Sequence, residues 1–197
     1  MRKKKKVDHF RRYNMRKLSF VFLVLIGCNG IHNNKASKSC PIDEKNGFKD
    51  IVLEECFLNY NERIKYELID ELKEYEFKTY RLLDEKYYAI GDIKLQDVNI
   101  VTLEDTILSI EIIEKQGLFL NNGLLNSLKK AYGEKKETRS NDYISCTWAG
   151  EKCLLSYSSN RIDDIFSNIS ATYSSKRLLN KFAKKRDDKV AENANNL

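Results

Sequence analysis

The chain has 197 residues, of which 42% are hydrophobic and 32% charged, a composition that excludes a disordered chain and fits one globular domain. The net charge of +6 comes from the N-terminus, because nine of the 35 Lys and Arg residues, against one of the 29 acids, precede Cys28. The remaining 26 bases and 28 acids give a net charge of −2. This balance removes the electrostatic case for a nucleic-acid partner.

Residues 18–27 form an apolar run that follows a strongly basic segment. A helix of this length rises about 15 Å, half of a bilayer core, so the run is typical of a signal peptide over residues 1–27. It ends with Leu25 and the pair Gly27-Cys28, which resembles the bacterial lipobox and predicts cleavage before Cys28 and lipidation of its thiol. An ordinary secretory signal or a buried strand is the alternative, and a compact signal beginning at Met15 leaves the start position open.

Lipidation at Cys28 would hold the mature chain on the periplasmic side of a cell membrane, with the membrane itself as a partner. Asn29 resembles the residue that directs lipoproteins to the outer membrane. Residues 28–46 are rich in Asn, Lys, Ser and Gly and predict a flexible tether. Residues 47–197 then form a single α+β domain, and the alternative that part of the tether packs on this domain near Cys40 stays open.

The hydrophobic periodicity of the domain predicts its elements in chain order. The expected elements are a strand at 47–53, an amphipathic helix at 59–74, strands at 77–83, 86–90, 93–102 and 106–114, a helix at 122–132, strands at 143–148, 153–158 and 165–173, and a charged helix at 175–192. Short links between consecutive strands favour antiparallel pairing. The predicted fold class is therefore α+β, an antiparallel sheet with helices packed on one face and a C-terminal helix.

Four cysteines lie beyond the lipidation site, an even number that is typical of disulfides outside the cytoplasm. If residues 149–150 form a two-residue hairpin turn, Cys146 lies opposite Cys153 within disulfide range. Cys40 and Cys56 would form a second bridge, and buried free thiols are the alternative. The spacing contains no CxxC pair or Cys/His cluster, so we expect no metal site.

The only histidines, His9 and His32, lie in the signal and the tether, which excludes a histidine triad and histidine metal ligands within the domain. All eight glycines are isolated, so no phosphate loop or dinucleotide fingerprint is present. Four acidic pairs could serve as catalytic carboxylates but fall in expected turns, where solvated acids are usual: Glu54-Glu55, Asp84-Glu85, Glu104-Asp105 and Asp163-Asp164. We therefore expect no catalytic residue, no cofactor and no enzyme.

Aromatic residues are the remaining candidates for a contact surface. Tyr87, Tyr88, Trp148 and Tyr157 could form a surface for a protein partner, although most aromatic residues in strands pack in the core.

Short motifs are spread over residues 47–190. They are Gly47-Phe48 with Ile51, Leu124 and Leu128 with Tyr132-Gly133, Trp148-Ala149-Gly150, and Ser174-Ser175-Lys176 with Leu178. The pattern resembles a family of uncharacterised bacterial periplasmic proteins and lipoproteins, and more loosely the SmpA/OmlA-type small lipoproteins of outer-membrane assembly. The likeness implies a location in the cell envelope and helices packed on an antiparallel sheet, and it implies no particular activity.

These features together predict a membrane-anchored, non-enzymatic binding module that presents a sheet edge or face to a protein partner in the cell envelope. The alternative function is an immunity or exclusion lipoprotein that inhibits a toxin or a phage component.

Overall fold

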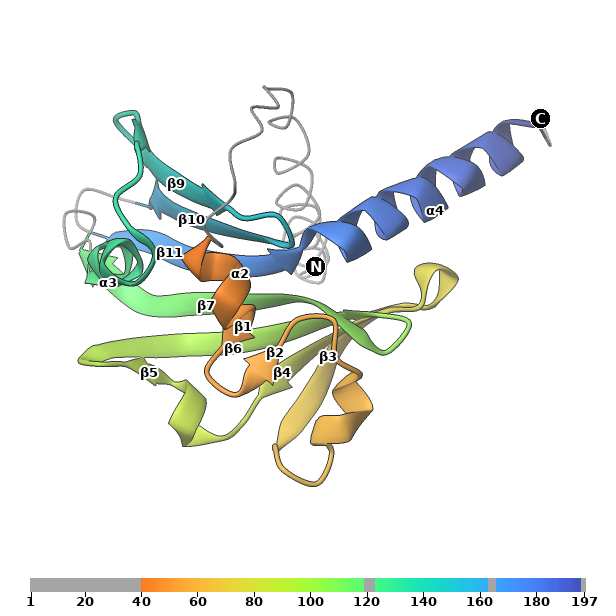
Figure 1. Ribbon diagram of the computed structural model, residues 1–197, viewed down its shortest axis with the longest axis horizontal. Helices are drawn as coiled ribbons and strands as arrows, with labels where there is room; N and C mark the ends of the chain where they lie inside the picture. The colour runs from red at the N-terminus through yellow and green to blue at the C-terminus, as the bar shows by residue number, and fades with distance from the viewer. Residues whose placement is uncertain (1–39, 119–122, 163–165, 196–197) are drawn as a thin grey trace, which may run out of the picture. The chain divides into compact units, whose positions relative to one another are not determined.

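One antiparallel sheet of nine strands dominates the protein, whose computed structural model describes residues 40–118, 123–162 and 166–195 (Figure 1). The strand order is β3-β4-β6-β7-β11-β10-β9-β8, and β5 pairs with β6 beside this path. The strands of this sheet are β3 (Tyr66–Leu72), β4 (Phe77–Leu82), β5 (Ala89–Ile90), β6 (Ile93–Leu103), β7 (Thr106–Leu118), β8 (Thr138–Arg139), β9 (Tyr143–Ala149), β10 (Cys153–Arg161) and β11 (Phe166–Ser175). A separate small hairpin consists of β1 (Gly47–Phe48) and β2 (Ile51–Val52).

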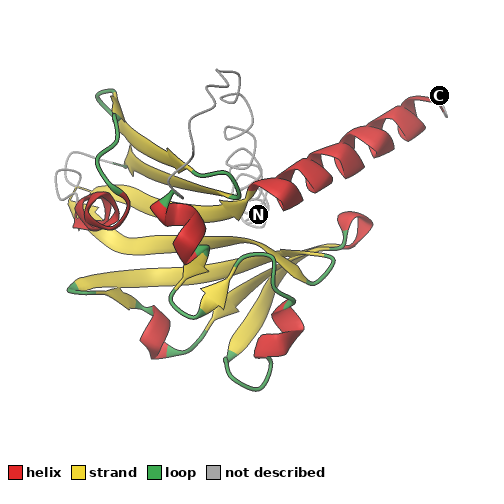
Figure 2. Cartoon of the chain, in the orientation of Figure 1, coloured by secondary structure: helices red, strands yellow, loops and turns green. Residues whose placement is uncertain are grey.

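Helices α2 (Pro41–Lys45) and α3 (Gly123–Tyr132) lie over the same side of the sheet (Figure 2). Their buried side chains, including Ile42 and Leu124, join the inward-facing residues of the strands in the main hydrophobic core. Helix α3 ends as the sequence predicts, because Gly133 takes a left-handed conformation (φ 89°) and its N–H donates to the carbonyl of Lys129.

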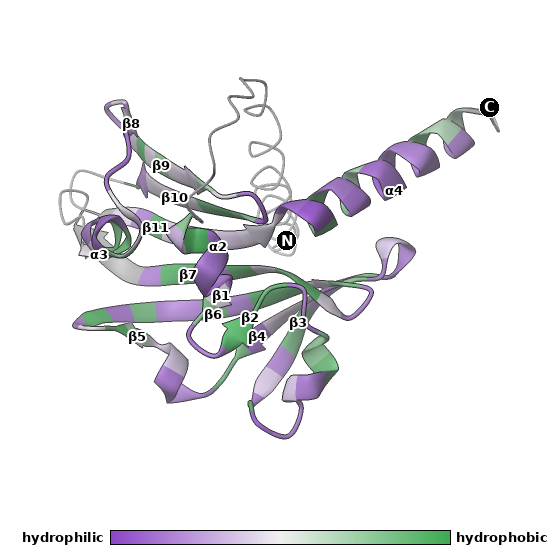
Figure 3. Cartoon of the chain, viewed as in Figure 1, coloured by the Kyte–Doolittle hydropathy of each residue, from purple (hydrophilic) through white to green (hydrophobic). Residues whose placement is uncertain are grey.

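Helix α4 (Lys176–Asn195) follows β11 directly. Its first turn is capped by Ser175, whose Oγ accepts a hydrogen bond from the N–H of Leu178 at 3.1 Å. Leu178 packs with Leu103 and Leu108 in a second, smaller apolar cluster. Farther along, α4 is mostly hydrophilic and runs away from the sheet (Figure 3). The predicted α+β class, with its antiparallel sheet and C-terminal helix, is confirmed.

The hairpin of β6 and β7 forms where alternation predicts it. On β7, Ile110 and Ile112 are fully buried and point toward the main core. The two-residue turn between the strands is Glu104-Asp105, and both residues have positive φ angles, 51° and 58°. Such a turn matches the right-handed twist of the paired strands, and acidic residues tolerate this conformation better than branched ones.

The amphipathic helix predicted at 59–74 is wrong, because the segment forms the short 3-10 helix η2 (Phe57–Tyr60) and then strand β3. The apolar stripe that suggested a helix is not buried as one face: Ile64 is 4% exposed, but Leu68 is 52% exposed. Residues 66–72 of this segment pair instead with β4, which satisfies the inward-facing backbone groups of β3. Pairing with the neighbouring strand therefore overrides the helical spacing.

The strand predicted at 86–90 is only partly present. The 3-10 helix η4 (Glu85–Tyr87) occupies its first half, and only β5 is extended. A third 3-10 helix, η3 (Lys73–Tyr75), joins β3 to β4. None of the helices in the described ranges is long and apolar enough to cross a membrane.

The predicted tether boundary at residue 46 is also wrong, because α2 belongs to the folded domain. Ile42 is 1% exposed within the main core. The carboxylate of Asp43 accepts hydrogen bonds from the N–H groups of Glu151, Lys152 and Cys153 at 2.6, 3.0 and 3.0 Å. Burial by itself raises the pKa of Asp43, but the hydrogen bonds from these backbone donors together outweigh that effect. The pKa of Asp43 therefore lies below its usual range. The alternative of packing near Cys40 is thus the correct one.

Candidate functional site

The aromatic residues proposed as a contact surface lie in the interior, which corrects that prediction. Tyr87 and Trp148 are fully buried, and Tyr157 is 1% exposed. The indole N–H of Trp148 donates to the carbonyl of Gly133 at 2.8 Å. Tyr88 is half-buried against the main core, and its hydroxyl donates to a backbone carbonyl of β4. Trp148 and Tyr157 share the inner side of the sheet with its apolar residues. Tyr87 and Tyr88 lie at the end of η4 and pack in or against the same core.

The cysteines do not pair as the hairpin pattern predicts. Cys146 lies opposite Tyr157, and Cys153 lies four residues before Tyr157 on β10. At 3.3 Å per residue, Cys153 is about 13 Å along the strand from the position opposite Cys146. This separation exceeds the reach of a disulfide. Both thiols are free and buried, and burial raises the pKa of Cys153 to about 11. Cys40 and Cys56 are half-buried free thiols, and a bridge between them stays a prediction.

The acidic pairs of the turns are engaged in structural contacts. Glu54 accepts hydrogen bonds from the hydroxyl of Ser175 and the guanidinium of Arg177, which joins it to the start of α4. Asp84 accepts the backbone N–H of Lys65 at 2.8 Å. Asp163-Asp164 lies outside the described residues. These carboxylates therefore hold neighbouring segments together.

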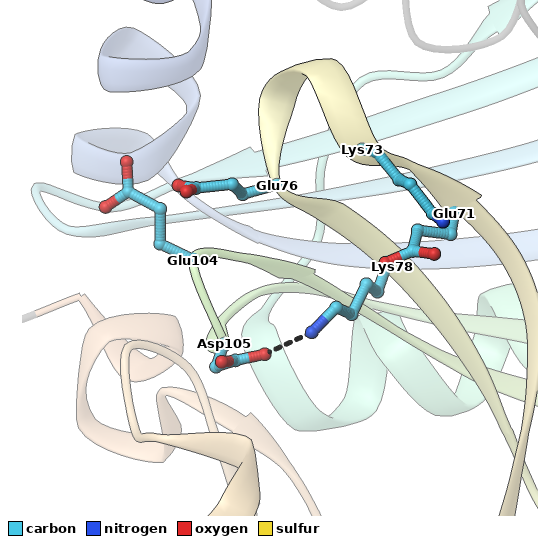
Figure 4. A pocket seen from close by; sticks show the side chains of 6 residues that line it. All are labelled: Glu71, Lys73, Glu76, Lys78, Glu104 and Asp105. Carbon is cyan, nitrogen blue, oxygen red and sulfur yellow. Dashed lines mark hydrogen bonds and ion pairs between the residues drawn. The ribbon is translucent and has the colours of Figure 1, made fainter.

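A charged depression of about 350 Å³ lies where the ends of β3 and β4 approach the turn between β6 and β7 (Figure 4). Its lining consists only of charged side chains, namely Glu71, Lys73, Glu76, Lys78, Glu104 and Asp105. No group of three or more histidines, cysteines and acids with metal-binding geometry occurs in the described ranges.

Ion pairs occupy most of this depression. Lys78 contacts Asp105 at 2.9 Å, and Lys185 of α4 contacts Glu76 at 3.2 Å and Glu104 at 3.3 Å. Hydrogen bonds from lysines of α4 lower the pKa of Glu104, the wrong direction for a catalytic acid at neutral pH. The ion pairs of this depression therefore hold α4 against the hairpin ends.

Strand β3 forms the open edge of the sheet, and we refer to residues 66–72 as the β3 edge. No described strand pairs with its outer side, so about half of its backbone N–H and C=O groups face outward. Five of its seven side chains are exposed and two are half-buried. Leu68 is 52% exposed and Leu72 is 40% exposed, so apolar surface accompanies the free backbone.

The register of β3 with β4 assigns the side chains of this edge to the two faces of the sheet. Glu67, Asp70 and Leu72 lie opposite Arg81, Thr79 and Phe77, which share one face of β4. Leu68 and Glu71 lie on the other face, and a bulge at Ile69 separates the two halves of the strand. Each face of the β3 edge therefore presents at least one acid and one exposed leucine.

Sequence reasoning missed this edge because it assigned the segment to a helix. The alternation of Tyr66 and Leu68 with Glu67 was the available strand signal, but the bulge at Ile69 interrupts it after three residues. The expectation of a contact surface at a sheet edge or face is compatible with β3, although the residues proposed for that surface were different ones.

A buried carboxyl lies within the sheet. Glu114 of β7 is 8% exposed, lies opposite the apolar residues Leu95 and Ile169, and leaves its Oε2 without a hydrogen-bond partner in the described structure. Burial raises the pKa of Glu114 to about 6. Because its paired neighbours are apolar, this group affects stability rather than forming a catalytic pair.

Comparisons of the chain with known protein families, curated proteins and solved structures found no match.

Proposed function

We propose that this chain is a lipid-anchored, non-enzymatic binding module of the bacterial cell envelope that binds an extended segment of a protein partner along the β3 edge. The observation that carries the proposal is the exposed edge strand with outward-facing backbone groups and half-exposed leucines. An extended peptide that adds to such an edge gains main-chain hydrogen bonds, and the side chains of the edge determine which peptide fits.

The anchor in this proposal rests on the sequence. The apolar run at 18–27 and the Gly27-Cys28 pair support lipidation at Cys28, which lies outside the described residues. Lipidation with two or more acyl chains gives stable membrane residence. The engaged acidic pairs and the absence of histidine from residues 40–197 favour binding over catalysis.

Photo-cross-linking in cells tests the binding edge. A photoreactive residue is placed at Asp70 or Leu72 on the β3 edge, and at Thr138 on the opposite end of the sheet as an exposed control. We expect both β3 positions to give a covalent adduct with the same envelope protein and Thr138 to give none. In the purified complex, amide hydrogen exchange within 66–72 should slow, because strand addition occupies the outward N–H groups.

Fatty-acid labelling tests the anchor separately. The wild-type chain should incorporate the label, and the Cys28→Ala variant should not. A wild-type chain without label contradicts the anchor, whereas adducts that form equally from Thr138, or unchanged exchange in β3, contradict the binding edge.

A further inference from the structure

The β3 edge is acidic, and two of its carboxylates have no cation within ion-pair distance. The strand itself contains Glu67, Asp70 and Glu71 and no Lys or Arg. Glu67 is paired with Arg81 of β4 at 3.0 Å. Asp70 and Glu71 are exposed and make no ion pair within the described ranges, although Glu71 lies opposite Lys78 and the Asp70 carboxylate accepts the N–H of Glu71 at 3.0 Å. Their carboxylates can still interact with cations of an incoming strand.

The same acids oppose pairing between two copies of the chain. Each face of the β3 edge carries at least one acid, so in an antiparallel pair of two copies the acids on the same face approach one another. Like charges directly opposite each other destabilise a strand pair, and charged residues on edge strands are a common protection against self-association.

We propose, as a consequence of the function proposed above, that the partner segment is an extended stretch that combines basic and apolar side chains on both of its faces. Each face of the β3 edge offers both an acid and an exposed leucine, so an antiparallel partner places a Lys or Arg opposite each acid and an apolar side chain opposite each leucine. Opposite charges at cross-strand positions stabilise the pair, and the leucines are covered.

Labelled peptides that match this complementarity test the proposal with the full-length chain in detergent. Opposite Leu72, Glu71, Asp70, Leu68, Glu67 and Tyr66, the complementary antiparallel sequence is Val-Lys-Lys-Val-Lys-Val. Two further peptides carry Ser or Glu in place of Lys. We expect the Lys peptide to bind at least about fivefold more tightly than the Ser peptide, and the Glu peptide to bind most weakly. The preference should shrink as the salt concentration approaches about 1 M.

A pair of variants isolates the charge of the edge. The double variant Asp70→Lys with Glu71→Lys should lose or reverse the preference for the Lys peptide. The matched control, Asp142→Lys with Glu151→Lys, changes the net charge equally at exposed positions on either side of β9, far from β3 in strand order, and should retain the preference. Circular dichroism of both variants verifies that they are folded.

The outcomes separate the two proposals. Equal binding of the Lys, Ser and Glu peptides, with β3 cross-links still formed in cells, overturns the basic partner and leaves the binding edge intact. If the chain self-associates and this association disappears in the variant Asp70→Lys with Glu71→Lys, the proposal of a basic partner segment is overturned. The occupant of the edge is then a second copy of this chain. Binding of none of the peptides, without cross-links from β3, overturns both.

Discussion

The two ends of the sheet differ in how their strands are covered. At one end the edge strand β8 has only two residues, and its neighbours β9 and β10 lie behind α2 and α3, where Trp148 and Leu155 are completely buried. At the other end, β3 has no described strand on its outer side, and most of its side chains are exposed. The first end is covered by helices, whereas the second leaves backbone and apolar groups accessible, which carries a risk of unwanted strand pairing.

If the proposed function holds, stability and partner contact are assigned to different ends of one sheet. A substitution at the covered end should therefore alter the free energy of unfolding, whereas a substitution on the β3 edge should alter binding and leave stability nearly unchanged. Each of the following predictions tests that division.

The largest expected effect is that of Leu155→Ala on β10. The wild-type side chain is completely buried opposite Trp148, so truncation leaves a cavity and should lower the free energy of unfolding by about 2–5 kcal/mol. The matched substitution Leu68→Ala removes the same atoms from a half-exposed site and should cost less than about 1 kcal/mol. Urea denaturation measures both, and equal losses would contradict the division between the two ends.

Asp43→Ala should have the next largest effect, because it removes the acceptor of three backbone hydrogen bonds that tie α2 to the hairpin of β9 and β10. We expect a loss of about 1.5–3 kcal/mol. Because the folded pKa of Asp43 is lowered, its contribution is complete above the unfolded pKa and is lost as the pH falls through the folded value. Wild type and variant should therefore converge in acid, and Asp142→Ala, at a largely exposed site, should change stability by less than about 0.5 kcal/mol.

Glu114→Gln should stabilise the protein at neutral pH. The folded pKa of Glu114 is raised to about 6 from an ordinary value of 4.5, so its ionisation opposes folding. The wild type has its full stability when this group is protonated and loses about 2 kcal/mol as the pH rises from about 4.5 through 6. The variant should lack this loss. Thermal unfolding at pH 4 and pH 7.5 measures the difference, and a variant no more stable at pH 7.5 would refute the assignment.

The smallest effect on stability is expected from Asp70→Lys with Glu71→Lys on the β3 edge. Both carboxylates are exposed and make no ion pair in the described structure, so the free energy of unfolding should change by no more than about 0.5 kcal/mol. Urea denaturation of this variant, carried out alongside the peptide measurements, verifies that any loss of peptide binding does not result from unfolding. A loss comparable to that of Asp43→Ala would show that the open edge is also structural.

The sequence predicts best those elements whose pattern is complete within their own length. The alternation on β7 and the helical stripe of α3 each place their apolar residues on the side that the structure buries. Gly133 marks the end of α3 for the same reason, because a left-handed residue closes the last turn. Such elements need no knowledge of distant partners.

The errors occur where contacts outside a segment determine its structure. Strand β3 depends on pairing with β4, the next strand along the chain, and the bulge at Ile69 interrupts its alternation. In the hairpin of β9 and β10, four residues instead of two separate the paired Ala149 and Leu154. Asp43, more than 100 residues away in the chain, accepts hydrogen bonds from N–H groups of this connection and so stabilises its longer form. A Cβ atom on Gly150 would lie 2.2 Å from the carboxylate of Asp43, so this contact also requires the glycine. The open edge was missed because the bulge hides the alternation of β3. The cysteine register was missed because the contact of Asp43 with the hairpin cannot be read from the local sequence.

The attachment of α2 to the hairpin loop has a mechanical consequence. A tensile load transmitted along the chain from residues before Cys40 reaches α2 first, and the three hydrogen bonds of Asp43 share it with the buried side chain of Ile42. Force is thus passed to the connection between β9 and β10, far in strand order from β3. A load applied from that side would therefore strain the attachment of α2 and leave the β3 edge undisturbed.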